Sequence, residues 1–309
     1  MSVISTIMEA FPLGADEVAM LIRTAPSRYK VHEIEKRNGR GKRTIAQPTA
    51  EIKAVQRLLL REYIAALPVS DVAKAYRKGV GIVDHATVHA PNRYLLKLDF
   101  KDFFPSVSGT DFLKHLKKYS SVASDDSKIL ARIFFWRPVG ERRLRLSIGA
   151  PSSPAISNTI LFDFDEEVNA YCVSRGVVYT RYADDLAFST SEPGVLGDVF
   201  DFVSRLCNTL RYPRLELNSD KTVFTSKKYH RQLTGLVLSN DGCASLGREK
   251  KRVLRAMAHR FGKGDLSEEE VKRLRGWLAF VCSVEPEFVE AIKRMLGEDD
   301  FMRLMRVVD

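Results

Sequence analysis

The sequence predicts an α+β protein in which a mixed region of helices and strands precedes an all-helical C-terminal region. The chain has 309 residues, of which 45% are hydrophobic and 28% charged, a composition typical of a folded protein with a core. Short apolar runs at 94–100, 177–182 and 186–189 indicate strands. Beyond residue 245 the apolar residues recur at helical spacing, so we expect a domain boundary there.

The N-terminal part is expected to contain two short helices, a hairpin and a longer helix. The two helices fall within residues 1–26 and are broken at Pro12-Leu13-Gly14. Apolar residues on both sides of a glycine-containing turn at 38–41 predict a β-hairpin over 29–47. Helical spacing then predicts a helix over 51–67.

Strands and helices are expected to alternate through the rest of the mixed region. In chain order, we predict a strand at 94–100, helices at 127–135 and 154–173, strands at 177–182 and 186–189, a helix at 194–210, and a strand pair at 222–224 and 232–238. The C-terminal region is predicted to be helical at 247–262, 267–282, 285–296 and 299–307.

The charge of the chain is positive and unevenly distributed. Lys and Arg outnumber Asp and Glu by 49 to 39, which gives a formal net charge of +10. Two runs, at 28–43 and 248–263, each have seven Lys or Arg residues, and the second predicts an amphipathic helix with one basic face. Such a face indicates contact with nucleic-acid phosphates, with a merely solvated surface as the alternative.

The sequence gives no sign of export or membrane insertion. No apolar run approaches the ~20 residues that span a bilayer, and the first residues lack the basic flank and apolar run of a secretory signal. The four cysteines lie far apart without a CxxC pair, so we expect free thiols rather than disulfides or zinc ligands. We therefore expect a cytoplasmic protein with no membrane partner.

Three aspartates stand at the ends of predicted strands. Asp184 and Asp185 are adjacent on a tight turn between apolar strands, and Asp99 lies near the end of the run at 94–100. Adjacent carboxylates in apolar surroundings are costly unless a cation compensates them. If the strand ends meet, the carboxylates form an oxygen-rich site suited to two Mg²⁺ ions, whereas an isolated Asp-Asp pair is usually a solvated turn.

Five motifs around these acids resemble the catalytic motifs of reverse transcriptases. Tyr182-Ala183-Asp184-Asp185 resembles the YxDD box, and LDFKDFFPSV at 98–107 resembles the first catalytic motif. SIGAPSSP, NSDKT and QLTGL, which are similar to the glycine-containing, lysine and primer-gripping motifs, follow at 147–154, 218–222 and 232–236. The resemblance implies an RNA-directed DNA polymerase with the right-hand fold. Its expected parts are fingers at 1–94 and 108–152, an antiparallel-sheet palm at 95–107 and 153–244, and a helical thumb at 245–309.

Two further signatures are similar to those of bacterial retron reverse transcriptases. The sequence at 85–89 resembles the NAxxH signature with His85 in place of Asn, and the sequence at 233–235 resembles the VTG triplet with Leu in place of Val. The resemblance implies contacts with RNA by His85, His89, Thr234 and Gly235, with helix stabilisation as a second role for the histidines. Zinc binding by the two histidines is not favoured, because Ala86 stands where the zinc-protease motif needs Glu.

The resemblance also implies roles for single residues. Asp99 and Asp184 are expected to bridge two Mg²⁺ ions, with Asp185 completing the acidic cluster and the Phe100 carbonyl as a further ligand. Phe104 is expected to exclude the 2′-hydroxyl that distinguishes a ribonucleotide. The other expected contacts to the nucleotide come from basic side chains, backbone amides and a glycine, namely Lys36, Arg43, Asp102, Phe103, Gly149 and Lys221. The basic helix is expected to contact RNA phosphates through Arg248, Lys250, Lys251, Arg252 and Arg255.

A retron reverse transcriptase is expected to copy part of a structured noncoding RNA. The resemblance implies priming from the 2′-hydroxyl of a guanosine, which yields branched multicopy single-stranded DNA (msDNA), and a role in antiphage defence. The implied partners are the RNA and its msDNA, deoxynucleotides, a separate effector protein and the host RNase H. Another prokaryotic reverse transcriptase, diversity-generating or intron-derived, and a non-catalytic RNA-binding scaffold for an effector are the alternatives.

Overall fold

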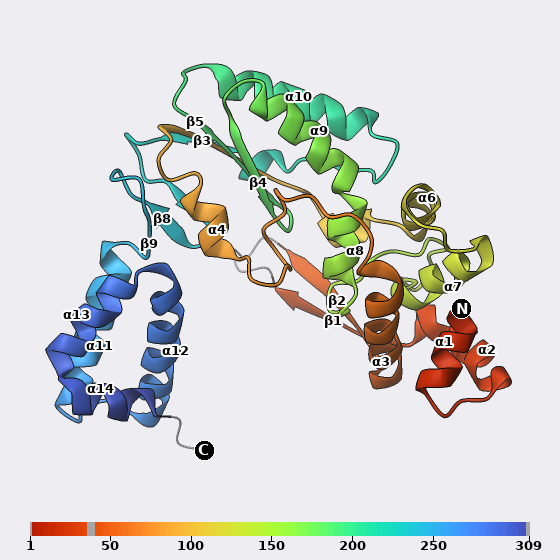
Figure 1. The fold of residues 1–309 in the computed structure, drawn as a ribbon, viewed down its shortest axis with the longest axis horizontal. Coiled ribbons are helices and arrows are strands. Elements are labelled where there is room, and N and C mark those ends of the chain that lie inside the picture. Colours follow the sequence, from red (N-terminus) through yellow and green to blue (C-terminus); the bar gives the residue numbers. More distant parts are fainter. Residues whose placement is uncertain (1, 36–40, 307–309) are drawn as a thin grey trace.

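A four-stranded antiparallel sheet lies at the centre of the protein in the computed structural model, which describes residues 2–35 and 41–306. We call it the palm sheet, and its spatial order is β4-β5-β3-β6 (Figure 1). Its strands are β3 (Tyr94–Asp99), β4 (Val178–Tyr182), β5 (Asp185–Thr190) and β6 (Val223–Ser226). The predicted α+β class with an antiparallel central sheet is confirmed.

The side-chain alternation of the palm strands separates an apolar face from a functional face. Leu98 of β3 and Leu186 of β5 pack in one apolar core with helices α9 (Phe162–Val173) and α10 (Val195–Thr209). Because neighbouring residues on a strand point to opposite faces, Asp99 and Asp185 lie on the face away from these helices. Helix α4 (Ile82–Thr87) packs against β4 at that second face.

The N-terminal part forms a second core of helices beside a hairpin. The hairpin consists of β1 (Tyr29–Glu35) and β2 (Lys42–Pro48), which pair in antiparallel register. The helical elements here are α1 (Val3–Ala10), α2 (Ala15–Thr24), η1 (Ala25–Ser27), α3 (Ala50–Leu59), the π-helical turn η2 (Leu60–Ile64), α6 (Gly109–Tyr119) and α7 (Ser124–Phe134). Their apolar faces share one cluster, so this part has its own packed core.

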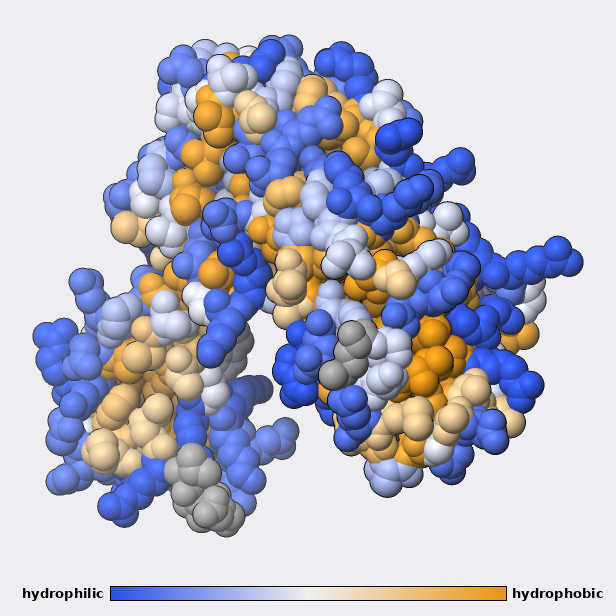
Figure 2. All heavy atoms as spheres, turned by 45° about the vertical axis from the view of Figure 1, so that its right-hand side comes forward, coloured by the Kyte–Doolittle hydropathy of each residue, from blue (hydrophilic) through white to orange (hydrophobic). Residues whose placement is uncertain are grey.

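The C-terminal region is a helical bundle that stands apart from the N-terminal helices. Its helices are α11 (Arg248–Gly262), α12 (Glu268–Val284), α13 (Pro286–Leu296) and α14 (Glu298–Met305). A small sheet of β7 (Gln232–Leu233), β8 (Leu236–Leu238) and β9 (Ala244–Ser245) precedes the bundle. Figure 2 shows an open cleft between the bundle and the N-terminal part, with hydrophilic residues on both of its sides.

Several predicted elements differ from the structure. The single helix expected at 154–173 is two helices, α8 (Ser153–Ile160) and α9, because the backbone leaves helical geometry at Leu161. The expected strand pair at 222–224 and 232–238 is wrong, since β6 pairs with β3 and the chain turns at 234–235 between β7 and β8. Helix α6 was not predicted, and two short elements, α5 (Phe103–Ser106) and η3 (Ser219–Lys221), complete the fold.

No helix in the described part of the chain is both long enough and apolar enough to span a bilayer.

Candidate active site

The three predicted acids meet at one end of the palm sheet. Asp99 pairs in register with Asp185 across β3 and β5, and the amide of Phe100 donates to the backbone oxygen of Asp184 at 3.1 Å. The tight turn between β4 and β5 places Ala183 at a positive φ of 58° and so carries Asp184 toward β3. The predicted convergence of the three acids is confirmed.

The acids carry more negative charge than their surroundings compensate. Burial and the neighbouring charge of Asp99 raise the pKa of Asp184, and burial with the charges of Asp184 and Asp99 raises the pKa of Asp185 to about 6. Carboxylates whose protonation is favoured in this way bind a divalent cation readily. The donor set therefore suits a hard metal ion, although within 2–35 and 41–306 no three His, Cys, Asp or Glu side chains are already grouped as metal ligands.

Two basic residues lie within electrostatic range of the acids. Lys221 Nζ donates to Asp99 Oδ2 at 2.8 Å. The charges of Lys221 and Arg43 counteract part of the rise in the pKa of Asp184, so Arg43 of β2 lies within electrostatic range of this acid. Lys36, expected beside it, lies outside the described residues.

The aromatic residues after Asp99 lie at two different depths. Phe103 is buried and stacks on Phe100 with ring centroids 5.6 Å apart, so its side chain belongs to the core. Phe104 is half-buried beside it and keeps part of its ring accessible. Asp102 has a left-handed backbone (φ 45°) and is exposed at the start of α5, so its side chain points into neither core cluster.

The backbone of Gly149 packs closely against strand β2 of the hairpin. Its φ is 117°, and a Cβ there would lie 3.0 Å from Gln47 Cγ and 3.3 Å from the Ala46 oxygen. The Ala46 amide donates to Ile148 O at 2.9 Å. The absence of a side chain at Gly149 therefore lets β2 pack tightly against the loop that leads into α8. The sequence had predicted a nucleotide contact at Gly149 but not this contact within the protein.

The structure corrects the expectation that His85 and His89 touch RNA. Both side chains are fully buried. His85 Nδ1 and His89 Nε2 each hydrogen-bond Thr180 Oγ1 at 2.7 Å, and His89 Nδ1 bonds Ser189 Oγ at 2.7 Å. Burial lowers the pKa of His85 to about 4 and that of His89 to about 3, so both are neutral at pH 7. They join α4 to the palm sheet, which is the helix-stabilising role.

Thr234 and Gly235 form the two-residue turn between β7 and β8. Both have positive φ, 44° and 88°, the geometry of a type I′ hairpin turn. Thr234 lies with Asp99, Asp185 and Lys221 on a pocket of about 280 Å³, and its hydroxyl is buried without a hydrogen-bond partner. This turn therefore presents a free polar atom to the pocket beside the acids.

The basic residues of α11 divide into two groups. Lys251 forms an ion pair with Glu285, Lys250 Nζ donates to Gly235 O at 3.3 Å and lies over the Trp277 ring, and Arg255 lies over the Phe288 ring. Arg248 and Arg252 are exposed on the same helix. Because Lys251 is already paired with Glu285, its expected phosphate contact would require this ion pair to open.

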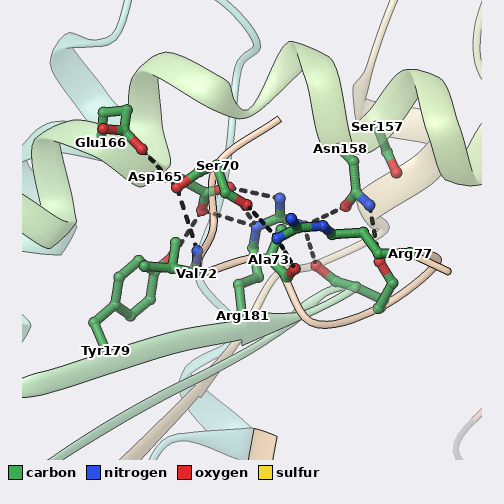
Figure 3. A network of polar contacts seen from close by, with 12 residues as sticks. Ser70, Val72, Ala73, Arg77, Ser157, Asn158, Asp165, Glu166, Tyr179 and Arg181 are labelled. Carbon is green, nitrogen blue, oxygen red and sulfur yellow. Dashed lines mark hydrogen bonds and ion pairs between the residues drawn. The ribbon is translucent and has the colours of Figure 1, made fainter. Parts of the chain in front are cut away.

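A buried polar network that the sequence did not predict joins β4 to α8 and α9 (Figure 3). Arg181 on β4 and Asp165 on α9 are both fully buried and form a two-pronged ion pair, with Arg181 Nη2 at 2.6 Å from Asp165 Oδ2 and Nε at 2.9 Å from Oδ1. Tyr179 also donates to Asp165. Arg181 Nη1 donates to Ala183 O at 3.1 Å, one residue before Asp184.

The signal for this network in the sequence is a charge within an apolar strand. Arg181 stands in VVYTRY, where burial requires a partner, but the partner on α9 becomes identifiable only in three dimensions. Asn158 of α8 extends the network, since it accepts from Arg181 and donates to Ala75 O at 2.8 Å.

Comparison with known proteins agrees with this geometry. The family model "Reverse transcriptase (RNA-dependent DNA polymerase)" matches residues 34–247, so the chain belongs to the reverse transcriptase family. The Ec83 retron reverse transcriptase of Escherichia coli is 38% identical over 298 residues, which cover 95% of this chain and 94% of that protein. The Ec86 retron reverse transcriptase of the same species is 33% identical over 90% of this chain and 83% of that protein. Within the family it is thus a retron reverse transcriptase, an RNA-directed DNA polymerase.

A solved structure supports the fold. The apo telomerase of Candida tropicalis matches with a TM-score of 0.51 at 12% identity, over 90% of this chain. The chain spans 60% of that telomerase chain. The predicted right-hand polymerase fold is confirmed, and at this level of identity the match concerns the fold alone.

Proposed function

We propose that Asp99, Asp184 and Asp185 hold two Mg²⁺ ions, with the Phe100 carbonyl as a further ligand, and that this site extends a DNA 3′ end on an RNA template. The single observation that carries the proposal is the register of β3 and β5, which pairs Asp99 with Asp185 beside Asp184. The raised pKa values of Asp184 and Asp185 support it, because bound cations supply the charge that the protein does not.

In the proposed reaction the 3′ oxygen of the growing strand forms a bond to the α-phosphorus of a deoxynucleotide, and the bond from that phosphorus to pyrophosphate breaks. The metal ions would lower the pKa of the attacking 3′-hydroxyl, whose proton passes to solvent, and would offset the negative charge that develops on the leaving pyrophosphate. Arg43, with Lys36, binds the triphosphate, and Lys221 protonates the departing pyrophosphate. The backbone amides of Asp102 and Phe103 bind phosphate oxygens, while Gly149 keeps the fingers hairpin close.

Phe104 is the proposed sugar gate. Its ring packs against the edge of both core clusters and keeps an accessible part, which can pack against a deoxyribose and exclude a 2′-hydroxyl. The template and product would lie in the cleft between the bundle and the N-terminal part, with the Thr234–Gly235 turn at the product end. Exposed Arg248 and Arg252, together with Lys250 and Arg255, would contact phosphates along it.

The proposed template is a structured noncoding RNA that is copied into msDNA from a 2′-hydroxyl primer on a guanosine. The support is the similarity to two retron reverse transcriptases over most of their lengths, together with the two signatures at 85–89 and 233–235. We extend the proposal to antiphage defence in the cytoplasm with a separate effector protein, and to removal of the template by the host RNase H.

Replacement of a single acid tests the active site. The Asp184→Asn variant is expected to lose DNA synthesis by at least about a thousandfold, because the charge that holds the metal ions falls while the shape of the turn is kept. Binding of the RNA, measured by filter retention, is expected to stay within about twofold, because the phosphate contacts lie elsewhere. Asp198→Asn, an exposed aspartate on α10, which packs on the opposite face of the palm sheet from the acids, serves as the matched control.

Undiminished synthesis by Asp184→Asn would refute the proposed site and leave the non-catalytic scaffold as the better account. Sequencing of the nucleic acid that co-purifies with the wild-type chain separates the retron proposal from its relatives. Branched DNA joined to one noncoding RNA supports the retron, whereas intron RNA or a variable-repeat transcript would support an intron-derived or diversity-generating enzyme.

A further inference from the structure

Tyr76 has a backbone conformation that bulky side chains rarely adopt. Its φ is 61°, in the left-handed region, and for a residue of this size such a conformation is strained. The side chain is nevertheless 50% exposed, so burial of the ring does not account for the strain. Outliers of this kind cluster where a side chain is held in place for a ligand.

The same buried polar network holds the loop that carries Tyr76. Asn158 Nδ2 donates to Ala75 O at 2.8 Å, directly before Tyr76, and Arg77 on the other side donates to Ser70 O and Ala73 O (Figure 3). Two backbone hydrogen bonds join the same loop to β4, from Arg181 N to Val72 O at 2.8 Å and from Lys74 N to Arg181 O at 2.7 Å. The conformation of Tyr76 is therefore fixed from both sides.

The ring of Tyr76 lies beside the proposed sugar gate and within electrostatic range of Asp184. Its centroid is 6.5 Å from that of Phe104, and the two rings are tilted by 36°. Burial and the charge of Asp184 raise the pKa of Tyr76, which places the phenol within electrostatic range of the acid and keeps it neutral at pH 7. Arg181 also donates to Ala183 O, so one network fixes both Tyr76 and the turn of Asp184.

We propose that the ring of Tyr76 is a second wall of the nucleotide pocket and contacts the incoming deoxynucleotide beside Phe104. The inference rests on the proposed function of Phe104 and Asp184. The aromatic ring, rather than the hydroxyl, makes the contact, because an accessible ring next to another aromatic ring offers a face to a sugar or base. Tyr76 is thereby a specificity-determining residue of the polymerase reaction.

Steady-state kinetics of the full-length chain on poly(rC) primed with oligo(dG) test this assignment. We expect Tyr76→Asn to raise the KM for dGTP about fivefold with kcat within about twofold, which matches the loss of one aromatic contact. Tyr76→Phe is expected to keep the wild-type KM, because it keeps the ring. Since Asn tolerates the left-handed backbone, Tyr76→Asn is expected to have a melting temperature at or above that of the wild type.

Two controls keep this test separate from that of the active site. Tyr229→Asn removes a tyrosine that is 65% exposed in the turn after β6, and it is expected to change neither KM nor kcat. Phe104→Ala is expected to raise incorporation of GTP relative to dGTP about tenfold. If Phe104→Ala behaves in this way and Asp184→Asn is inactive, but Tyr76→Asn leaves the KM for dGTP within twofold, the role of Tyr76 is refuted while the site stands. A loss of melting temperature with unchanged KM would likewise make Tyr76 a purely structural residue.

Discussion

Two polar clusters that contain carboxylates lie on opposite faces of the palm sheet. On the helix-covered face, Asp165 is fully buried, and its carboxylate accepts three hydrogen bonds from Arg181, its ion-pair partner, and one from Tyr179. On the other face, Lys221 is bonded directly to Asp99, and the pKa values of Asp184 and Asp185 are raised. The first cluster is complete within the protein, whereas the second needs charge from outside.

The contrast separates groups that hold the fold from groups that await a ligand. It recurs in the aromatic pair, where Phe103 is buried in the core and Phe104 is only half-buried. It recurs again on α11, where Lys251 is paired with Glu285 while Arg248 and Arg252 are exposed. In each case adjacent residues of the same chemical type differ in whether the fold uses their charge or surface.

The largest expected effect comes from breaking the buried cluster. Asp165→Asn leaves the Arg181 charge uncompensated in the core, which is expected to lower the free energy of unfolding by about 3–5 kcal/mol. Urea denaturation measures the loss. The double variant Arg181→Met/Asp165→Leu is expected to lose less than either single variant, because it removes both charges. If either single variant were as stable as the wild type, Arg181 and Asp165 would not depend on each other for compensation of their buried charges.

At the cluster of Asp99, Asp184 and Asp185, removal of a charge is expected to increase stability, by a smaller amount. Because the pKa of Asp185 is raised to about 6 in the folded chain, the folded state binds more protons than the unfolded state below that pH, and stability from this group is lost as pH rises through 6. In EDTA at pH 8, Asp185→Asn is therefore expected to raise the melting temperature by about 1–2 °C. This value is discounted for solvent screening because part of the surface of Asp185 stays exposed, although desolvation contributes to the rise in its pKa. Thermal scans at pH 8 and pH 5 measure the difference.

The gain from Asp185→Asn should shrink toward pH 5, where the wild-type carboxyl is itself largely protonated. A loss of stability at pH 8 in EDTA would contradict the comparison, since it would show that the acid cluster is satisfied within the protein.

The smallest expected effect concerns the two groups of cations on α11. Replacing exposed Arg248 and Arg252 by Ser is expected to reduce the slope of log affinity for RNA against log salt by about 1 per residue, because fewer counterions are released. Lys251→Ala is expected to leave the slope unchanged, since Lys251 is already paired with Glu285. Filter binding between low and high salt measures both slopes, and an equal reduction by Lys251→Ala would show that the ion pair opens for RNA.

The sequence predicted the three acids and the fold class, but it did not predict the strand pairing and the buried polar contacts that hold the acids in place. Asp99, Asp184 and Asp185 were identifiable because charged residues at the ends of apolar runs are rare enough to carry information, and the hairpin turn and the helical C-terminal region follow from local patterns. The pairing of β6 with β3 was missed, because strand partners distant in the chain leave no local signal.

The burial of the two histidines was missed for a related reason. The sequence shows His85 and His89 only as polar residues on a short helix. The packing of α4 on the palm sheet shows that Thr180 hydrogen-bonds both of them and that Ser189 hydrogen-bonds His89. The left-handed backbone of Tyr76 could not be predicted at all, because nothing in the residue type favours it.

The hydrogen bond from Lys250 to Gly235 has a consequence for movement in this molecule. It ties the first turn of α11 to the loop beside the acids, and Phe280 and Val284 of α12 pack against the small sheet that carries that loop. A rotation of the C-terminal bundle would therefore carry the Thr234–Gly235 turn with it. In the proposed function, binding of the duplex by α11 and alignment of the growing 3′ end would therefore be coupled through this contact. A variant that loses the contact would make shorter DNA in each binding event.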